Sequence, residues 1–345
     1  MIATLSMPQL GLIFFTFFSI TWTLTPVFGF IARKFQILDF PTQDHKSHTS
    51  PVPYLGGLAI VLPYCVSGAL ALVFLDSYSV VGNAGLTFFG LALMISILGL
   101  LDDIYPLSAI LRLILQFSFS ILAIYAMSTA DLLIGFFPNS EFNVLVSLLW
   151  FVTMINAFNF VDNMDGSVTG ISLVASLSIF VIALLGNQAI LTLLSLSLAG
   201  SCLGFLFWNR SPAKIFLGDS GSLFLGFAFA ALTIMVEPTT KSSIGFLATP
   251  ILLLAIPLFD IILVTLNRIY RKTSPFQGGR DHLAHRLLGF GLSKESAVAF
   301  IWFLTILTCS TAILLQIVGL VAERILIAFS GIFLTVAFFF LFKKH

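Results

Sequence analysis

Residues 144–185 read VLVSLLWFVTMINAFNFVDNMDGSVTGISLVASLSIFVIALL. The central stretch, residues 156–170, holds three asparagines, two aspartates and two glycines, and an oily segment lies on each side of it. A helix needs about 20 predominantly apolar residues to cross the hydrocarbon core of a bilayer. The two flanks therefore predict membrane-spanning helices, and the centre predicts polar side chains gathered where those helices meet the membrane surface.

The composition of the whole chain supports a membrane class. Of its 345 residues, 59% are hydrophobic and only 9% are charged, and the mean hydropathy is +1.08. Soluble domains carry roughly 25% charged residues, so this chain could not cover a water-facing surface. The net charge of +1 and the lack of a basic stripe predict no binding to nucleic acid.

Apolar runs predict an all-α, polytopic membrane helix bundle that forms one domain over residues 1–345. About eleven transmembrane helices are expected, at roughly 8–31, 54–75, 81–101, 109–128, 143–161, 167–186, 188–208, 221–236, 243–266, 296–319 and 323–342. The first is not a cleaved signal peptide, because no Lys or Arg precedes it and its apolar run is longer than a signal h-region. Cys65, Cys202 and Cys309 fall inside predicted spans, so neither a disulfide nor a zinc site is expected.

The basic residues give the orientation. Lys and Arg in short loops stay on the cytoplasmic side. With eleven spans, 14 of the 16 basic residues fall on one side: Arg33, Lys34, Lys46, Arg112, Arg210, Lys214, Arg268, Arg271, Lys272, Arg280, Arg286, Lys294, Lys343 and Lys344. Only Lys241 and Arg324 fall on the other. The N-terminus is therefore expected outside and the C-terminus in the cytoplasm.

The acids gather on the same side, although they were not used to set the topology. The cytoplasmic face receives Asp102, Asp103, Asp162, Asp165, Asp219, Asp260 and Asp281, with His282 and His285. The other face receives Asp76, Asp131, Glu141, Glu237 and Glu323, which we expect to be solvated loop charges. Simple pairing of the cytoplasmic acids with nearby basics is the structural alternative. It does not require the asparagines that accompany Asp162 and Asp165.

Residues 98–108, LGLLDDIYPLS, place two adjacent acids at the end of the third span, where Pro106 prevents a simple continuation of the helix. Asp102 and Asp103 repel each other unless a metal ion or a basic group lies beside them. On its own the pair is a weak signal, because adjacent acids at helix ends are common.

The asparagines of the opening stretch share one side of a helix. Asn156, Asn159 and Asn163 lie within about 60° of one another, and Asp162 lies about 60° further round. Amide and carboxylate oxygens are ligands that hard divalent cations prefer, and amides also recognise a base or a sugar. The alternative is hydrogen bonding between helices, which is common for Asn in membrane bundles.

Residues 216–226, FLGDSGSLFLG, set Asp219 in a glycine-rich turn that opens a helix. Free backbone N–H groups and the positive end of the helix dipole suit phosphate, and the carboxylate suits Mg²⁺. The alternative is an ordinary N-cap aspartate.

The loop at 267–293, NRIYRKTSPFQGGRDHLAHRLLGFGLS, carries His282 and His285 three residues apart, followed by Arg286. Such a pair can bind a metal, phosphate or sugar hydroxyls. Zinc is not expected, because no Cys or third His lies nearby. Taken together, the motifs suit phosphoryl transfer between a soluble nucleotide-sugar and a lipid phosphate.

The chain resembles the polyprenyl-phosphate N-acetylhexosamine-1-phosphate transferase family (glycosyltransferase family 4), which includes undecaprenyl-phosphate GlcNAc-1-phosphate transferases. The motifs that carry the resemblance run in family order from DFPTQDHKSHTSPVPYLGG (39–57) through LLDD, NAFNFVDNMDG and GDSGSLFLG to DHLAHRL (281–287). The resemblance implies transfer of N-acetylhexosamine 1-phosphate from a UDP-sugar to undecaprenyl phosphate, with release of UMP. It also implies a Mg²⁺ cofactor, which Mn²⁺ can replace, and a bacterial cytoplasmic membrane location. Dimers occur in the family, so a homodimer is compatible with it.

The resemblance also implies roles for residues. Asp102 and Asp103 match the pair that engages the lipid phosphate, and Asp219 and Asn159 match the metal-binding positions. The substrate-binding positions are matched by Lys46, His48, Arg112, Asn156, Asp162, Asp165, His282, His285 and Arg286.

One position departs from the family pattern. Ala284 replaces the middle His of the usual His-Leu-His-His-Arg loop, so the sugar is not fixed. Tyr54 and Leu55 before Gly56 differ from the MurNAc-pentapeptide branch and favour an N-acetylhexosamine donor. That branch stays an alternative, and a transporter of lipid-linked or anionic substrate is an alternative from another class. A transporter should place ionisable groups near the midplane. An intramembrane metalloprotease is not expected, because HExxH is absent.

Overall fold

The computed structural model describes residues 6–40, 51–76, 80–129, 140–240, 242–274, 279 and 281–343, and it is built almost entirely of helices. The helices are α1 (Met7–Lys34), α2 (Gly56–Asp76), α3 (Val80–Ile104), α4 (Ala109–Thr129), α5 (Ser140–Val161), α6 (Ser167–Leu185), α7 (Ala189–Asn209), α8 (Gly218–Met235), α9 (Ser243–Leu253), α10 (Ala255–Tyr270), α11 (Leu283–Gly289), α12 (Lys294–Leu314) and α13 (Leu320–Lys343). Two short strands, β1 (Leu38–Asp39) and β2 (Val52–Pro53), pair antiparallel.

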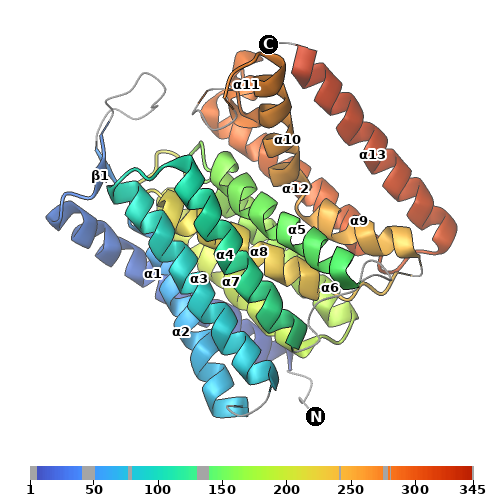
Figure 1. Cartoon of the computed structure of the whole chain (residues 1–345), viewed down its shortest axis with the longest axis horizontal. Coiled ribbons are helices and arrows are strands. Elements are labelled where there is room, and N and C mark those ends of the chain that lie inside the picture. The colour runs from blue at the N-terminus through green and yellow to red at the C-terminus, as the bar shows by residue number, and fades with distance from the viewer. Residues whose placement is uncertain are drawn as a thin grey trace.

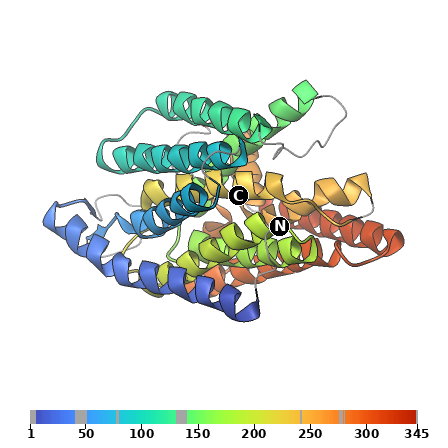
Figure 2. The same cartoon turned by 90° about the horizontal axis from the view of Figure 1, so that it is seen from below.

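The helices are long and apolar enough for a membrane bundle. Within the described residues, nine can cross a membrane by length and composition, and the bent pair α9–α10 could supply a tenth span. The prediction of an all-α polytopic membrane bundle is confirmed. Figure 1 shows the helices side by side, with β1 and α11 toward one end, and Figure 2 shows α1 and α4 on opposite sides of the bundle.

The predicted span at 243–266 is not one straight helix. It is divided into α9 and α10, which meet at Leu254 with a bend of 76°. Pro257 explains the break, because its ring has no N–H for the carbonyl of Leu253 and would clash with that carbonyl in a continuous helix. The chain resumes at once, since the N–H of Leu258 donates to the carbonyl of Leu254 at 3.1 Å.

The helix α8 forms the centre of the bundle and is buried along nearly its whole length. Glycines let its neighbours approach it closely. A Cβ on Gly226 would lie 2.5 Å from Cα of Ile155 on α5, and one on Gly99 of α3 would lie 2.2 Å from the carbonyl oxygen of Asp219. Small residues permit such backbone contacts in membranes. The packing therefore fixes the first turn of α8 against α3 and α5.

The far end of the bundle corrects one expectation. Glu323, predicted to be a solvated loop charge, is fully buried and accepts a hydrogen bond from the Ser242 hydroxyl at the start of α9. Because α13 begins at Leu320, its first turn brings this carboxylate against α9 instead of into a loop. Glu141 and Glu237 are exposed, as expected. The side chain of Asp76 and all of Asp131 lie outside the described part of the chain.

Candidate active site

Asp219 occupies the first turn of α8, and its position is set by Asp103 at the end of α3. The carboxylate of Asp103 accepts the N–H groups of Asp219 at 3.0 Å and Ser220 at 3.4 Å. These are two of the helix N–H groups that have no partner within α8. Gly218 precedes them with φ +71°, and a Cβ there would lie 2.6 Å from Oδ2 of Asp103. Only glycine fits this turn without strain.

The segment from β2 to α2 secures the same turn from the other side. The N–H of Gly57 donates to the carbonyl of Leu217 at 2.8 Å, and the N–H of Phe216 donates to the carbonyl of Pro53 at 2.8 Å. A Cβ on Gly57 would lie 2.4 Å from the nitrogen of Gly221. The two glycine-rich motifs found in the sequence are therefore packed backbone against backbone.

Arg112, on α4, links two of the predicted acids. Its guanidinium forms an ion pair with Asp102 and lies 3.5 Å from Oδ2 of Asp219. The other oxygen of Asp102 accepts the N–H of Leu107 at 2.7 Å, which turns the chain after α3 toward α4. Asp102 is buried, whereas the Arg112 side chain is 29% exposed and can reach a ligand.

The three asparagines at the end of α5 have different hydrogen-bond partners. The side-chain amide of Asn159 donates to Oδ1 of Asp219 at 2.8 Å and to Oγ of Ser222 at 3.1 Å. That of Asn156 donates instead to Gln116 on α4 at 2.7 Å. The amide of Asn163 donates to the carbonyl of Phe160. Of the three, Asn159 therefore joins Asp219 directly, and Asn156 holds α4 against α5.

Asp162 and Asp165 follow the end of α5. Burial raises the pKa of Asp162 well above its ordinary value, and the nearby Asp219 and Asp165 raise it further. Asp165 accepts the N–H of Ala213 at 2.9 Å. Asn209, which the sequence analysis missed, accepts the N–H of Gly166 at 3.1 Å and donates to the carbonyl of Ile215 at 3.1 Å. The only sequence signal for it was a polar residue at the end of an apolar run.

The charges of this cluster do not balance. Asp102, Asp103, Asp162 and Asp219 lie around one helix terminus, and among the described residues only Arg112 pairs with any of them. Within the described ranges, no three His, Cys, Asp or Glu side chains converge on a single point. Mg²⁺ is usually bound by one or two carboxylates together with substrate phosphates. The residues present fit such an open site.

The predicted sugar-recognition segment lies at the end of α10. Nδ1 of His282 is 2.8 Å from Oδ2 of Asp260, whose other oxygen accepts the N–H of Leu283 at 2.6 Å. Arg268 forms two hydrogen bonds with Asp281, at 2.9 and 2.8 Å.

Phe160, next to Asn159, contacts both parts of this segment. Its ring meets the edge of the His282 ring at 5.5 Å between centroids, and the Arg268 guanidinium lies 5.7 Å from its centroid. The segment is thereby joined to the end of α5. The sequence analysis noted Asp260 and Arg268 only as charges, and their roles as anchors were not foreseen.

Of the remaining predicted residues, two lie on α11 and two lie outside the described part of the chain. His285 is half-buried on α11. Arg286 is buried and donates to the carbonyl of Asp281 at 2.7 Å and to that of Leu341, on α13, at 2.6 Å. Its described contacts are with backbone, not with the Asp219 cluster. Lys46 and His48 lie outside the described residues.

Comparison with known proteins is consistent with this geometry. Residues 85–237 match the profile of glycosyl transferase family 4. The chain is 34% identical to a probable undecaprenyl-phosphate N-acetylglucosaminyl 1-phosphate transferase of Bacillus subtilis, over 85% of this chain and 81% of the relative. It is 31% identical to a decaprenyl-phosphate N-acetylglucosaminephosphotransferase of Mycobacterium leprae, over 85% and 80%.

A third relative, an undecaprenyl-phosphate alpha-N-acetylglucosaminyl 1-phosphate transferase of Thermotoga maritima, is 32% identical over 77% of this chain and 78% of its own length. The first two matches each cover 85% of the chain, so they extend well beyond the 85–237 profile. The chain therefore belongs to the polyprenyl-phosphate N-acetylhexosamine-1-phosphate transferase family, glycosyltransferase family 4.

Proposed function

We propose that the protein transfers N-acetylhexosamine 1-phosphate, most suitably GlcNAc 1-phosphate, from a UDP-sugar to undecaprenyl phosphate. The observation that carries the proposal is the cluster of Asp219, Asn159 and Arg112 beside the buried Asp102. It combines surplus carboxylates with an accessible guanidinium at the end of a membrane bundle. The names of the relatives supply the N-acetylglucosaminyl group and the prenyl phosphate.

The donor set suits Mg²⁺, with Mn²⁺ expected to replace it. Asp219 and Asn159 would hold the ion. The Asn159 amide, whose nitrogen donates to Asp219 in the structure, would turn by half a rotation so that its oxygen faces the ion. When bound, Mg²⁺ would neutralise charge on the substrate diphosphate. The surplus of acids around Asp219 is the feature that supports this assignment.

The reaction exchanges one diphosphate linkage for another. An oxygen of the lipid phosphate forms a bond to the β-phosphorus of the UDP-sugar. The bond from that phosphorus to the bridging oxygen breaks, and UMP leaves with the oxygen and its electron pair. A phosphate monoester has a second pKa of about 6, so at neutral pH the nucleophile is already largely deprotonated. Catalysis then depends on position and charge, as in other phosphoryl transfers.

The protein side chains supply those two factors. Arg112 is placed to contact the diphosphate, since it lies between Asp102 and Asp219 and is partly exposed. Both oxygens of Asp103 already accept backbone N–H groups of α8. Asp103 is therefore better suited to hold the first turn of α8 than to remove a proton. Asp102 orients Arg112 in the same manner.

The α10–α11 segment would recognise the sugar, with His282 and His285 as the contacting residues. Asp260 fixes the ring of His282 through Nδ1, which leaves Nε2 for a ligand. Arg286 would act indirectly, because it anchors this segment to α13. We further infer that the cluster faces the cytoplasm of a bacterial inner membrane, with the N-terminus outside. The distribution of Lys and Arg supports that orientation.

A reconstituted assay tests the proposal. Purified full-length protein is incubated with undecaprenyl phosphate, Mg²⁺ and a panel of UDP-sugars that includes UDP-GlcNAc and UDP-MurNAc-pentapeptide, and UMP and lipid product are measured. We expect UMP and lipid-linked GlcNAc in equal amounts, and none after addition of EDTA. Preferred use of the MurNAc-pentapeptide donor would overturn the choice of sugar. Transport of labelled substrate without UMP release would overturn the enzymatic proposal.

A further inference from the structure

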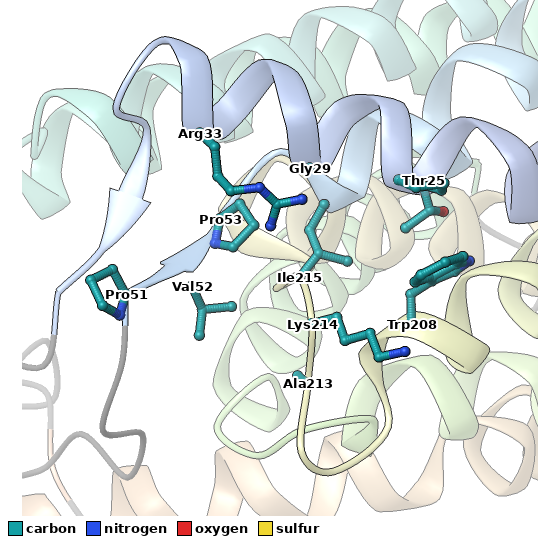
Figure 3. Close-up of a pocket in the computed structure, with 11 residues that line it drawn as sticks. Thr25, Gly29, Arg33, Pro51, Val52, Pro53, Trp208, Ala213, Lys214 and Ile215 are labelled. Atoms are coloured by element: carbon teal, nitrogen blue, oxygen red, sulfur yellow. The ribbon is translucent and has the colours of Figure 1, made fainter.

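A second cavity lies between α1, β2 and the loop at 210–217 that joins α7 to α8. Its volume is about 330 Å³, and none of the Asp219-cluster residues lines it. Small-molecule sites have volumes of roughly 300–1,000 Å³. Figure 3 shows Arg33 extending from α1 and Lys214 extending from the loop beneath Trp208, with Ile215 between them and Val52 to one side.

Among the described residues that line the cavity, the charged side chains are all basic. Arg33 and Lys214 are its charged side chains, and neither forms an ion pair with a carboxylate in the part of the chain that the structure describes. The ammonium of Lys214 lies 5.1 Å from the centroid of the Trp208 ring. That ring is held in turn, because its N–H donates to the carbonyl of Trp22 on α1 at 3.0 Å. Two cations thus face one space, and the described residues around it supply no counter-charge.

Apart from Thr25, the remaining side chains of the lining are apolar. Pro26, Val52 and Ile215 form walls beside the two cations, and Trp208 closes one side. Tryptophan is enriched where a membrane meets water, and basic pockets between transmembrane helices on the cytoplasmic side bind anionic lipid head groups. We propose that this cavity holds the phosphate of an anionic membrane lipid, with Arg33 and Lys214 on the phosphate and the apolar walls against the lipid chains.

The position of the cavity connects it to the active site. Within the 210–217 loop, Lys214 lines the cavity, while the N–H of the preceding Ala213 donates to Asp165 at 2.9 Å. Phe216, two residues further, is hydrogen-bonded to Pro53, and Asp219 follows after the glycine turn. A ligand that binds only the folded state stabilises it. Lipid bound here would therefore stabilise the loop that leads into the first turn of α8, where Asp219 lies.

Thermal unfolding of the purified full-length protein tests the site without relying on transfer activity, so a failed proposal for the enzyme would leave this test intact. Dioleoyl-phosphatidylglycerol, dioleoyl-phosphatidylcholine or inorganic phosphate is added in a neutral detergent. We expect phosphatidylglycerol to raise the unfolding midpoint with a saturating dose dependence. In Arg33→Gln/Lys214→Gln protein its apparent affinity should fall about 25-fold, from about fivefold for each cation near a membrane surface.

A matched variant, Lys34→Gln/Arg271→Gln, removes two exposed cations that do not line the cavity. It should keep the wild-type response. Lys214→Gln alone removes an exposed side chain without a carboxylate partner, so it should fold normally and lose about fivefold in affinity. An unchanged response in either cavity variant, or an equal one to phosphatidylcholine, would overturn the proposal. An equal response to inorganic phosphate would overturn the assignment to a lipid.

Discussion

Two acid-rich regions at the same end of the bundle differ in how their charges are balanced. At the α10–α11 junction, Asp260 pairs with His282, and Asp281 pairs with Arg268. Around the first turn of α8, four carboxylates share one guanidinium among the described residues. The acids of the first region are neutralised within the protein, whereas the second region retains negative charge that a divalent cation could neutralise.

The comparison distinguishes structural acids from functional acids by their partners. A buried charge that has lost its only partner is strongly destabilising, so the paired region should be sensitive in stability. Carboxylates that repel one another destabilise the folded protein, so their presence around the first turn of α8 indicates a role in function. Substitutions of these carboxylates should therefore lower activity more than stability. Substitutions at the α10–α11 junction should therefore lower mainly the stability of the protein, and substitutions around the first turn of α8 should lower mainly its activity.

Asp219→Asn should lower the rate of UMP release by about 100-fold or more, because removing one preorganised electrostatic group from a transfer site typically has an effect of this size. The readout is the initial rate with saturating UDP-GlcNAc, undecaprenyl phosphate and Mg²⁺. Glu237→Gln, at an exposed acid at the opposite end of the bundle, is the control and should be unchanged. A rate within about threefold of wild type for Asp219→Asn would remove Asp219 from the site.

Arg112→Gln should lower kcat/KM for UDP-GlcNAc by about 10- to 100-fold, since it removes the accessible cation of the cluster and leaves Asp102 buried without its partner. Arg112→Lys should recover only part of the loss, because an ammonium cannot contact two acceptors in one plane. If both variants lose kcat/KM equally, the positive charge itself is not what matters.

Asp281→Asn should destabilise the protein by about 1–3 kcal/mol, because it weakens two hydrogen bonds to a buried guanidinium. Burial alone would raise the pKa of Asp281, but Arg268 lowers it below its ordinary value. A depressed pKa gives stabilisation that is full above about pH 4 and is lost as the pH falls. The difference in unfolding midpoint between wild type and variant should therefore shrink in acid. A difference independent of pH would exclude the ion pair as its source.

Asp162→Asn should have the smallest effect, and it should be stabilising. Burial and the neighbouring Asp219 raise the pKa of Asp162, so the ionised carboxylate disfavours the folded state as the pH rises above about 4. In EDTA, the unfolding midpoint of the variant should exceed that of wild type by about 1–3 °C, with a larger gain at pH 8 than at pH 5. A lower midpoint at pH 8 would show that this acid is paired.

Local periodicity predicted the helical bundle, and the family resemblance placed Asp219 and Asn159 together. Periodicity alone could not separate Asn156 from Asn159. The two residues lie about 60° apart on one helix, and α5 packs against both α4 and α8, so the neighbouring helices decide which partner each amide meets.

Arg286 illustrates a second limit. Its place in a charged motif predicted substrate binding, and the structure adds two carbonyl partners, one of them 55 residues away on α13. Backbone carbonyls leave no trace in a sequence pattern, so such an anchor is visible only once the helices are assembled. The burial of Glu323 was also not predicted, because its partner, the Ser242 hydroxyl, lies 81 residues away in the chain.

The two anchors together have a consequence for α13. Its first turn is fixed through Glu323 to Ser242, and its last turn is fixed through Leu341 to Arg286, while only 6% of the intervening span is buried. In Figure 1 this helix stands at the margin of the molecule. Most side chains between these two attachment points are exposed, so few contacts of the chain depend on them. Amino-acid substitutions should accordingly be tolerated along the middle of α13 and restricted at its two attachment points.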